Sequence, residues 1–234
     1  MFKLLSTANP KIQKGTKLGY LTFILHLAPA DLSGHEVCAK RTPGCTNSCL
    51  NRAGRGGMFK TGETTNAIQK ARIRKTQYFF DNRMSFMLDL KRDIERAIGF
   101  AERKGLTPVF RLNGTSDLAW EKHDMIPGQN VFECFPNVQF YDYTKIVGRK
   151  TAGIANYHLT FSRAENNDAD VARAEQQGMN VVAVYDQLPM GVFDADLTDL
   201  RFLDPQGARM GLKAKGPAKR DTTGFVIRLQ PVDN

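Results

Sequence analysis

Short apolar runs alternate with longer helix-like segments along this chain of 234 residues, and this alternation constrains its fold more than any other feature. An apolar run of about four to eight residues is typical of a buried strand, and apolar residues three or four positions apart are typical of a helix. Strands that alternate with helices form mostly parallel sheets. Some later connections are too short for complete helices, so we expect a partial or irregular (β/α) barrel, built as one domain from residues 1–234.

The positions of the expected elements follow from these patterns. A polar lead-in, residues 1–19, precedes a first strand at 21–27. A long helical region at 65–103 divides into two helices at residues 81–83, where Asp, Asn and Arg interrupt the apolar pattern. Further strands are expected at 107–112, 138–142, 157–161, 180–185, 200–203, 210–213 and 224–229, and shorter helices at 118–121 and 168–177.

Three of the four cysteines lie in the segment 35–57, which follows the first expected strand. They are Cys38, Cys45 and Cys49. The carboxyl ends of strands are where (β/α) folds carry their chemistry. Three thiolates can bind three irons of a [4Fe–4S] cluster and leave the fourth iron open to another ligand. Zinc is the alternative metal, since His35 or Cys134 could complete a four-ligand site.

Polar side chains also follow the other expected strands. They are Asn113, Ser116 and Asp117 after the second strand, Tyr143 and Lys145 after the third, Ser162 and Arg163 after the fourth, and Lys213 and Lys215 near the C-terminus. Asp117 and Ser162 have a second interpretation as helix caps. We expect the tyrosine and the three lysines of this set to face an anionic substrate.

The charge of the chain is strongly basic, with 33 Lys and Arg against 24 Asp and Glu and a formal net charge of +9. This balance suits a nucleotide, a nucleic acid or another polyanion as partner. The basic run at 70–75 predicts either a solvated helix face or an anion-binding surface. The Gly-Arg-Gly-Gly stretch at 54–57 is either an ordinary loop or a backbone cradle for an anion.

The expected location is the cytoplasm, with no membrane contact. No apolar run approaches the roughly 18 residues of a membrane-spanning helix. The N-terminus lacks the apolar segment of a secretory signal. Because the cytoplasm keeps thiols reduced, the cysteines are expected to be metal ligands or buried thiols and not disulfides.

Seven short motifs are spread over nearly the whole chain. They lie at residues 4–10, 27–34, 38–50, 111–117, 138–145, 156–162 and 211–216, and include Thr-Pro-Gly-Cys in the cysteine segment and Arg-Leu-Asn-Gly-Thr-Ser-Asp at 111–117. Together these motifs resemble the gene product 88 family of phages and prophages. The resemblance implies a phage origin and a place in the host cytoplasm.

The three-cysteine segment after a first strand is also distantly similar to radical S-adenosylmethionine enzymes. That resemblance implies a cluster whose open iron binds the amine and carboxylate of S-adenosylmethionine. It also implies that Asn113, Ser116 and Asp117 hold the amine end of this cofactor, and that Ser162 and Arg163 meet its ribose and carboxylate. The cysteine gaps are six and three residues here, where those enzymes have three and two.

The sequence as a whole favours a phage-encoded iron–sulfur protein with radical S-adenosylmethionine-like chemistry. The expected substrate is anionic, a nucleotide or a nucleic acid. One alternative is a metal-stabilised phage protein that binds nucleic acid without catalysis. A third is a regulator that binds a host protein.

Overall fold

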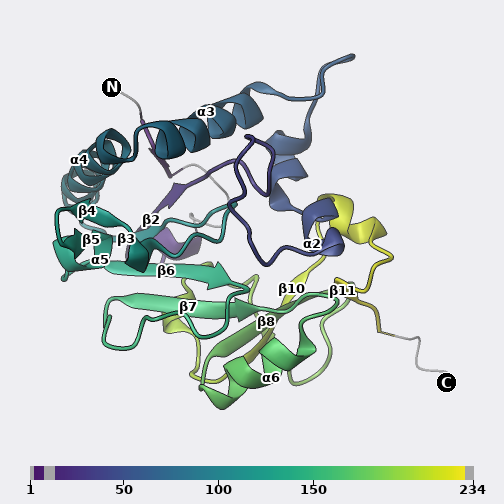
Figure 1. Ribbon diagram of the computed structural model, residues 1–234. Helices are drawn as coiled ribbons and strands as arrows, with labels where there is room; N and C mark the ends of the chain where they lie inside the picture. The colour runs from purple at the N-terminus through teal and green to yellow at the C-terminus, as the bar shows by residue number, and fades with distance from the viewer. Residues whose placement is uncertain (1–2, 8–13, 230–234) are drawn as a thin grey trace.

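A mixed sheet of nine strands forms the centre of the fold (Figure 1). The computed structural model describes residues 3–7 and 14–229. The strands of this sheet are β1 (Leu5–Ser6), β2 (Tyr20–Leu25), β3 (Thr107–Arg111), β6 (Gln139–Thr144), β7 (Tyr157–Ser162), β8 (Asn180–Tyr185), β9 (Phe193–Asp194), β10 (Arg209–Lys213) and β11 (Val226–Ile227). They lie in the order β1-β2-β3-β6-β7-β8-β10-β9, and β11 also pairs with β8. Two further strands, β4 (Asp124–Ile126) and β5 (Gln129–Asn130), form a separate antiparallel ladder.

The large sheet is mostly parallel, as the sequence predicts. In the described part of the chain only β1 runs antiparallel to its neighbour, β2. The strands expected at 21–27, 107–112, 138–142, 157–161 and 180–185 correspond to β2, β3, β6, β7 and β8. No pairing joins the end strands β1 and β9 within the described residues, so a barrel is not shown.

The long helical region divides where the sequence predicts it. The α-helices that lie wholly within the described residues are α2 (Pro43–Asn47), α3 (Ala67–Asp81), α4 (Arg83–Glu102), α5 (Val131–Cys134) and α6 (Asp168–Gln176). Asn82 separates α3 from α4. Its backbone is not helical, with φ −145° and ψ 69°, and so ends the first helix, while its side chain accepts a hydrogen bond from the backbone N–H of Ser85 and caps the second.

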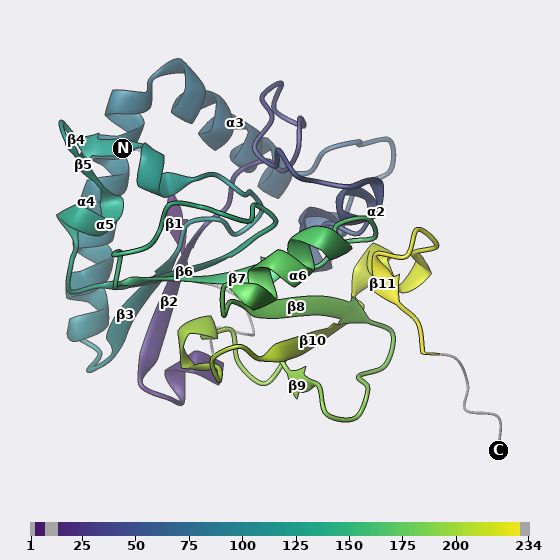
Figure 2. The same cartoon turned by 60° about the horizontal axis from the view of Figure 1, so that its bottom comes forward.

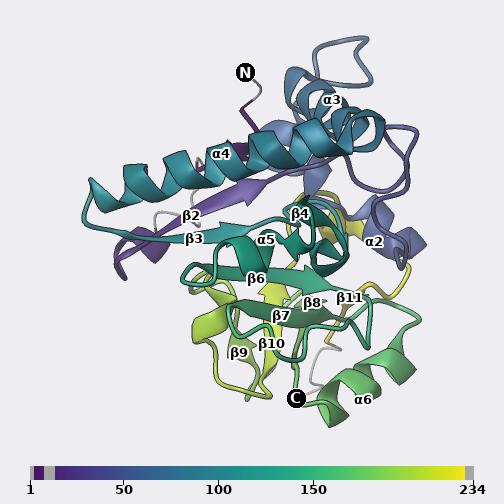
Figure 3. The same ribbon diagram turned by 60° about the vertical axis from the view of Figure 1, so that its left-hand side comes forward.

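The α-helices cover one face of the sheet. α4 lies along β2 and β3 (Figure 3) and buries Phe86 and Leu90 completely, since residues four positions apart share one side of a helix. α6 packs Ala174 against Phe161 of β7. Phe161 is two residues from Leu159, which belongs to the core beneath α4, so both helices cover the same face. Burying each large apolar side chain stabilises the fold by about 1.5–3 kcal/mol.

The opposite face of the sheet is covered by irregular chain. The strand predicted at residues 200–203 lies on this face, and that prediction is wrong. Residues 200–203 do not form a strand: Leu200 precedes a short 3₁₀-helix, η4 (Arg201–Leu203), and packs on Val109 and Tyr141. The cause is Arg201, whose side chain is fully buried and ion-paired to Asp204, with Nε 3.2 Å from Oδ2. A helical turn places these two charges together, and an extended strand would point them apart.

The predicted helix at 118–121 is also wrong. The chain forms only a short 3₁₀-helix, η3 (Trp120–Lys122), which leads into β4. The expected cap at Asp117 is not made, because this carboxylate accepts a hydrogen bond from the backbone N–H of Lys145 instead. η3 has no side-chain cap: its N-cap residue is Ala119, and Oδ1 of Asn113 accepts the backbone N–H of Leu118 at 2.9 Å in the turn before it.

Part of the lead-in at residues 1–19 is buried and belongs to the sheet, which the sequence does not predict. Residues 1–2 and 8–13 of it lie outside the described part of the chain. Within the described part, Leu4 and Leu5 are buried, and β1 joins the sheet beside β2. Among the described helices, none has the length and apolar character needed to cross a membrane.

Candidate functional site

The cysteine segment lies at the carboxyl edge of the sheet, beyond the ends of β2 and β3. The Sγ of Cys38 is 3.5 Å from the backbone N of Ala30, which follows β2, and 3.9 Å from the carbonyl oxygen of Thr115, which follows β3. Cys45 lies in α2, and Cys49 follows that helix. The local fold is encoded by Thr42 and a proline at the first turn: the Thr42 hydroxyl caps the helix by accepting the backbone N–H of Cys45.

A carboxylate from another part of the chain holds α2 in place. Glu165 accepts hydrogen bonds from the Thr42 hydroxyl at 2.6 Å and from the backbone N–H of Gly44 at 2.7 Å. Gly44 is packed so closely that an added Cβ would lie 2.1 Å from Oγ1 of Thr223 and 2.6 Å from Cβ of Phe225. α2 therefore lies against the segment that leads into β11 (Figure 2).

Removal of this carboxylate is expected to loosen the cysteine segment. Glu165→Ala should lower the free energy of unfolding by about 1.5–3 kcal/mol, because hydrogen bonds to a charged acceptor contribute about that much. Urea unfolding of the purified variant measures the change. The matched control is Glu63→Ala, which removes an exposed glutamate and should leave the midpoint unchanged. Equal midpoints for both variants would show that Glu165 does not anchor α2.

The three thiols face a common region of the molecule. Burial, together with the negative charges of Cys49, Asp117 and Cys45, raises the pKa of Cys38 to about 12, although the backbone N–H of Ala30 opposes the rise. All three cysteines are free and only partly exposed. The thiol of Cys38 is therefore protonated at neutral pH, and a metal would have to displace its proton on binding.

Two basic side chains lie beside Cys49. Burial is the main reason that the pKa of Cys49 is raised, and Cys45 adds to the rise. The positive charges of Arg72 and Lys145 act in the opposite direction and favour the thiolate. The same two side chains would balance part of the negative charge of thiolates bound to a metal.

The described residues contain no group of three or more His, Cys, Asp or Glu side chains that is arranged to hold a metal ion. His35, one candidate for a fourth zinc ligand, stacks its ring on Phe80 at 4.2 Å between centroids. The other candidate, Cys134, lies in α5, where its Sγ is 3.9 Å from Gln129. Neither side chain joins the three thiols in a compact tetrahedral set.

Three of the other predicted site residues lie together beside the thiols. The backbone N–H of Lys145 donates to Oδ2 of Asp117 at 2.8 Å, and the ammonium of Lys145 donates to the hydroxyl of Ser162 at 2.9 Å. The Asp117 backbone N–H donates to the carbonyl oxygen of Val37, next to Cys38. Ser162 is therefore a partner of Lys145 and not a helix cap.

Asp117 has one buried oxygen without a hydrogen bond. Its Oδ1 lies 3.7 Å from Nη1 of Arg149, and neither of these two atoms has a hydrogen-bond partner. Burial raises the pKa of Asp117, while the backbone N–H of Lys145 and the hydroxyl of Thr144 oppose the rise. An ammonium group brought to this carboxylate would supply both a charge and the missing donor.

Asn113 and Ser116 are engaged within their own loop. Oδ1 of Asn113 accepts hydrogen bonds from the Ser116 hydroxyl at 2.8 Å and from Nε1 of Trp120 at 3.2 Å, in addition to the Leu118 N–H. Its Nδ2 donates to the carbonyl oxygen of Leu118. These two side chains fix the turn after β3 and so position Asp117.

The contacts of the remaining predicted site residues do not involve the thiols. Arg163 donates to the carbonyl oxygen of Gly224, and Lys215 pairs with Asp196 at 2.6 Å. The ring of Tyr143 lies under the guanidinium of Arg111 at 4.7 Å, within the core on the opposite face of the sheet. Lys213 is exposed.

The basic run at 70–75 is not one cationic surface. Lys70 and Arg74 are exposed, but Arg72 donates to Oδ1 of Asn51 and Lys75 donates to the carbonyl oxygen of Leu4. Burial, followed by the charge of Arg72, lowers the pKa of Lys75 to about 8. The sequence does not predict that Arg72 lies close to Cys49. A signal for it is present, because the buried residues Gln69 and Thr76 lie three positions before and four positions after Arg72 and share its side of α3.

The glycine-rich stretch at 54–57 has a structural role in the described fold. It forms a 3₁₀-helix, η2 (Gly54–Gly57), whose carbonyl oxygens accept hydrogen bonds from buried amides of α3 and its cap. The Asn66 amide donates to the oxygens of Arg55 and Gly56, and the Gln69 amide donates to that of Gly56. These bonds connect the end of the cysteine segment to α3.

Comparisons with known proteins place the chain in one family. The gene product 88 family model matches residues 3–229. No curated protein and no solved structure matches the chain, so these comparisons do not support the likeness to radical S-adenosylmethionine enzymes. The family match covers nearly all of the sequence and agrees with the resemblance carried by the seven motifs. The chain therefore belongs to the gene product 88 family.

Proposed function

We propose that this member of a phage protein family is an iron–sulfur protein in which Cys38, Cys45 and Cys49 bind three irons of a [4Fe–4S] cluster. The observation that carries the proposal is the convergence of three free thiols at the carboxyl edge of a parallel sheet, where their charges raise the pKa of Cys38. In (β/α) folds this edge carries the chemistry. The proposal also includes the expectation that the mostly parallel sheet curves into a partial barrel.

The number of thiols favours a cluster over zinc. Three thiolates match three irons of a cubane and leave the fourth iron open, whereas zinc in a structural site takes four protein ligands. The two candidates for a fourth ligand are occupied elsewhere: His35 stacks on Phe80, and the thiol of Cys134 lies beside Gln129.

The reaction that this site supports best is radical S-adenosylmethionine-like chemistry on an anionic substrate, a nucleotide or a nucleic acid. When bound, the cluster supplies an iron with an open coordination position and an electron. Asp117 would bind the amine of the cofactor through its unpartnered Oδ1. Lys145 would pair with a carboxylate or a substrate phosphate once it leaves Ser162, and Arg72 would balance the charge of the thiolates.

Cofactor cleavage tests the enzymatic part of the proposal. The reduced, iron-loaded protein is expected to release 5′-deoxyadenosine from S-adenosylmethionine. Asp117→Asn should lower the rate about tenfold or more, equal to at least about 1.4 kcal/mol of lost interaction, while the iron content stays the same. Asp168→Asn is the control, because that carboxylate is 80 % exposed at the start of α6.

An intact cluster without any cleavage would overturn the enzymatic part. The metal centre would then be a structural clip, and the chain would be a metal-stabilised nucleic-acid-binding protein or a regulator of a host protein. The net charge of +9 favours the first of these two.

A further inference from the structure

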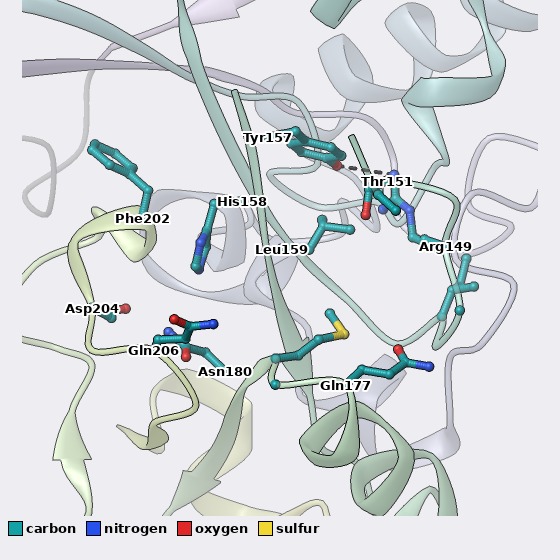
Figure 4. Close-up of a pocket in the computed structure, with 15 residues that line it drawn as sticks. Arg149, Thr151, Tyr157, His158, Leu159, Gln177, Asn180, Phe202, Asp204 and Gln206 are labelled. Carbon is teal, nitrogen blue, oxygen red and sulfur yellow. Dashed lines mark hydrogen bonds between the residues drawn. The ribbon is translucent and has the colours of Figure 1, made fainter. Parts of the chain in front are cut away.

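A cavity lies at the amino ends of β7 and β8, at the opposite end of these strands from the edge that carries the cysteines. Its volume is about 660 Å³, within the range of about 300–1,000 Å³ that small-molecule sites have. Its walls come from the segment between β6 and β7, the start of β7, the end of α6 and the turn after η4 (Figure 4). None of the residues assigned to the iron site lines this cavity.

The cavity has two polar ends and an apolar middle. Figure 4 shows His158, Asn180, Asp204 and Gln206 toward one end, where the imidazole of His158 extends toward the two amides. Thr151, Arg149 and Gln177 lie toward the other end. Leu159 lies between the two groups, and Met179 also contributes to the wall. A ligand that fits must therefore carry polar groups at both ends and a flat or apolar part between them.

Three buried atoms of lining residues have no hydrogen-bond partner in the described structure: Nη1 of Arg149, Nδ2 of Asn180 and Oδ2 of Asp204. Arg149 and Asp204 lie in ion pairs, so Asn180 is the uncharged one of the three. Asn180 is 2 % exposed; its Oδ1 accepts the backbone N–H of Ala208 at 3.0 Å, but its Nδ2 donates to no atom of the described chain. An unsatisfied buried donor costs about 1–3 kcal/mol. A ligand acceptor facing Nδ2 would remove this cost.

The charged groups that line the cavity are already paired. Asp204 lies beside Arg201, and Arg149 is bound to Glu121 and to the Tyr157 hydroxyl. Burial raises the pKa of Asp204 to about 6 and lowers the pKa of His158, so the imidazole is neutral at pH 7. No lining side chain in the described structure offers a free charge, which disfavours a phosphorylated ligand.

We propose that this cavity binds an uncharged nucleoside. The donor of Asn180 and the mixed donor and acceptor groups of Gln206 match the edge of a nucleobase, which carries both kinds of group. Leu159, which lies between the two polar ends, provides an apolar surface for the planar base. Thr151 and the Gln177 amide at the other end match the hydroxyl groups of the ribose.

Isothermal titration calorimetry with adenosine, guanosine, cytidine and uridine tests this proposal. We expect at least one nucleoside to bind with a dissociation constant below about 1 mM, and its 5′-monophosphate to bind more weakly. Asn180→Asp keeps the acceptor for Ala208 but replaces the free donor, and should weaken binding about tenfold or more. Gln177 is exposed and lines the cavity, so Gln177→Trp should block the cavity. Gln176→Trp is the matched control and should not block it, because this residue, the last of α6, is also exposed but does not line the cavity.

Two results would overturn the proposal. One is the absence of binding for all four nucleosides at about 5 mM, or tighter binding of the uncharged disaccharide maltose. The other is nucleoside binding that neither Asn180→Asp nor Gln177→Trp weakens. Iron content is measured on the same samples and is expected to be unchanged, so failure here is distinguishable from failure of the iron–sulfur proposal.

Discussion

Replacing any one of Cys38, Cys45 and Cys49 by alanine is expected to abolish the brown colour and the iron content of the anaerobically purified protein. The unchanged protein should contain about four irons and as many sulfides per chain, as a cubane requires. Loss of one of three thiolates leaves too few ligands to hold the cluster, so the effect should be close to complete. Iron and acid-labile sulfide analysis, with the visible absorbance spectrum, measures it.

Cys134→Ala is the matched control for this experiment. Cys134 lies in α5, and its thiol is beside Gln129, apart from the other three cysteines. The iron content should therefore not change. Stoichiometric zinc and no iron, in protein from cells fully supplied with iron, would show that the cluster assignment is wrong. Iron retained in all three cysteine variants would show that the metal lies elsewhere.

Asp199→Ala is expected to be the most destabilising single change outside the cysteine segment. The side chains of Asp199 and Arg111 are 5 % and 10 % exposed. Nη1 of Arg111 donates to Oδ2 of Asp199 at 3.1 Å and to Oδ1 at 3.4 Å. Removing the carboxylate leaves a buried guanidinium without its partner. Loss of one member of a buried ion pair costs about 3–5 kcal/mol, and urea unfolding should show a decrease of that size.

Two further variants make the result specific. Glu175→Ala removes a surface ion pair with Arg209, which is 76 % exposed, and should change stability little. The double variant Arg111→Met with Asp199→Leu should recover most of the lost stability, since an apolar pair of similar volume often replaces a buried ion pair without loss. A decrease of under about 1 kcal/mol for Asp199→Ala would mean that Arg111 finds another partner or water.

Much of the fold could be predicted because its longest elements have clear periodicity. α3, α4 and the central strands β2, β3, β7 and β8 all lie where the apolar patterns place them. The errors occur where a polar residue finds a distant or local partner. Arg201 makes the segment 200–203 helical through Asp204, and Asp117 accepts a hydrogen bond from the backbone N–H of Lys145 instead of capping a helix. The short elements β1, β4, β5, β9 and α5 are too brief to carry a period.

The candidate site could be predicted in part for the same reason. Strand ends are local signals, and they located Asp117, Lys145 and Ser162, which the structure brings together. Glu165 and Arg72 were missed, because their roles depend on partners far away in the sequence: Gly44 lies 121 residues before Glu165. The cavity at Asn180 has no motif, since its wall comes from four separate segments.

The contact between α2 and the segment before β11 has a consequence for the timing of assembly in the cell. Cys45 packs against a cluster that includes Ala164 and, much later in the sequence, Phe225 and Val226. A ribosome completes this cluster only after Val226 has been synthesised, so the loop with the three thiols waits unsupported until then. Under the proposed iron–sulfur assignment, the centre would reach its finished form only after this segment has been made, and shorter translation products would carry the three thiols without the support of α2.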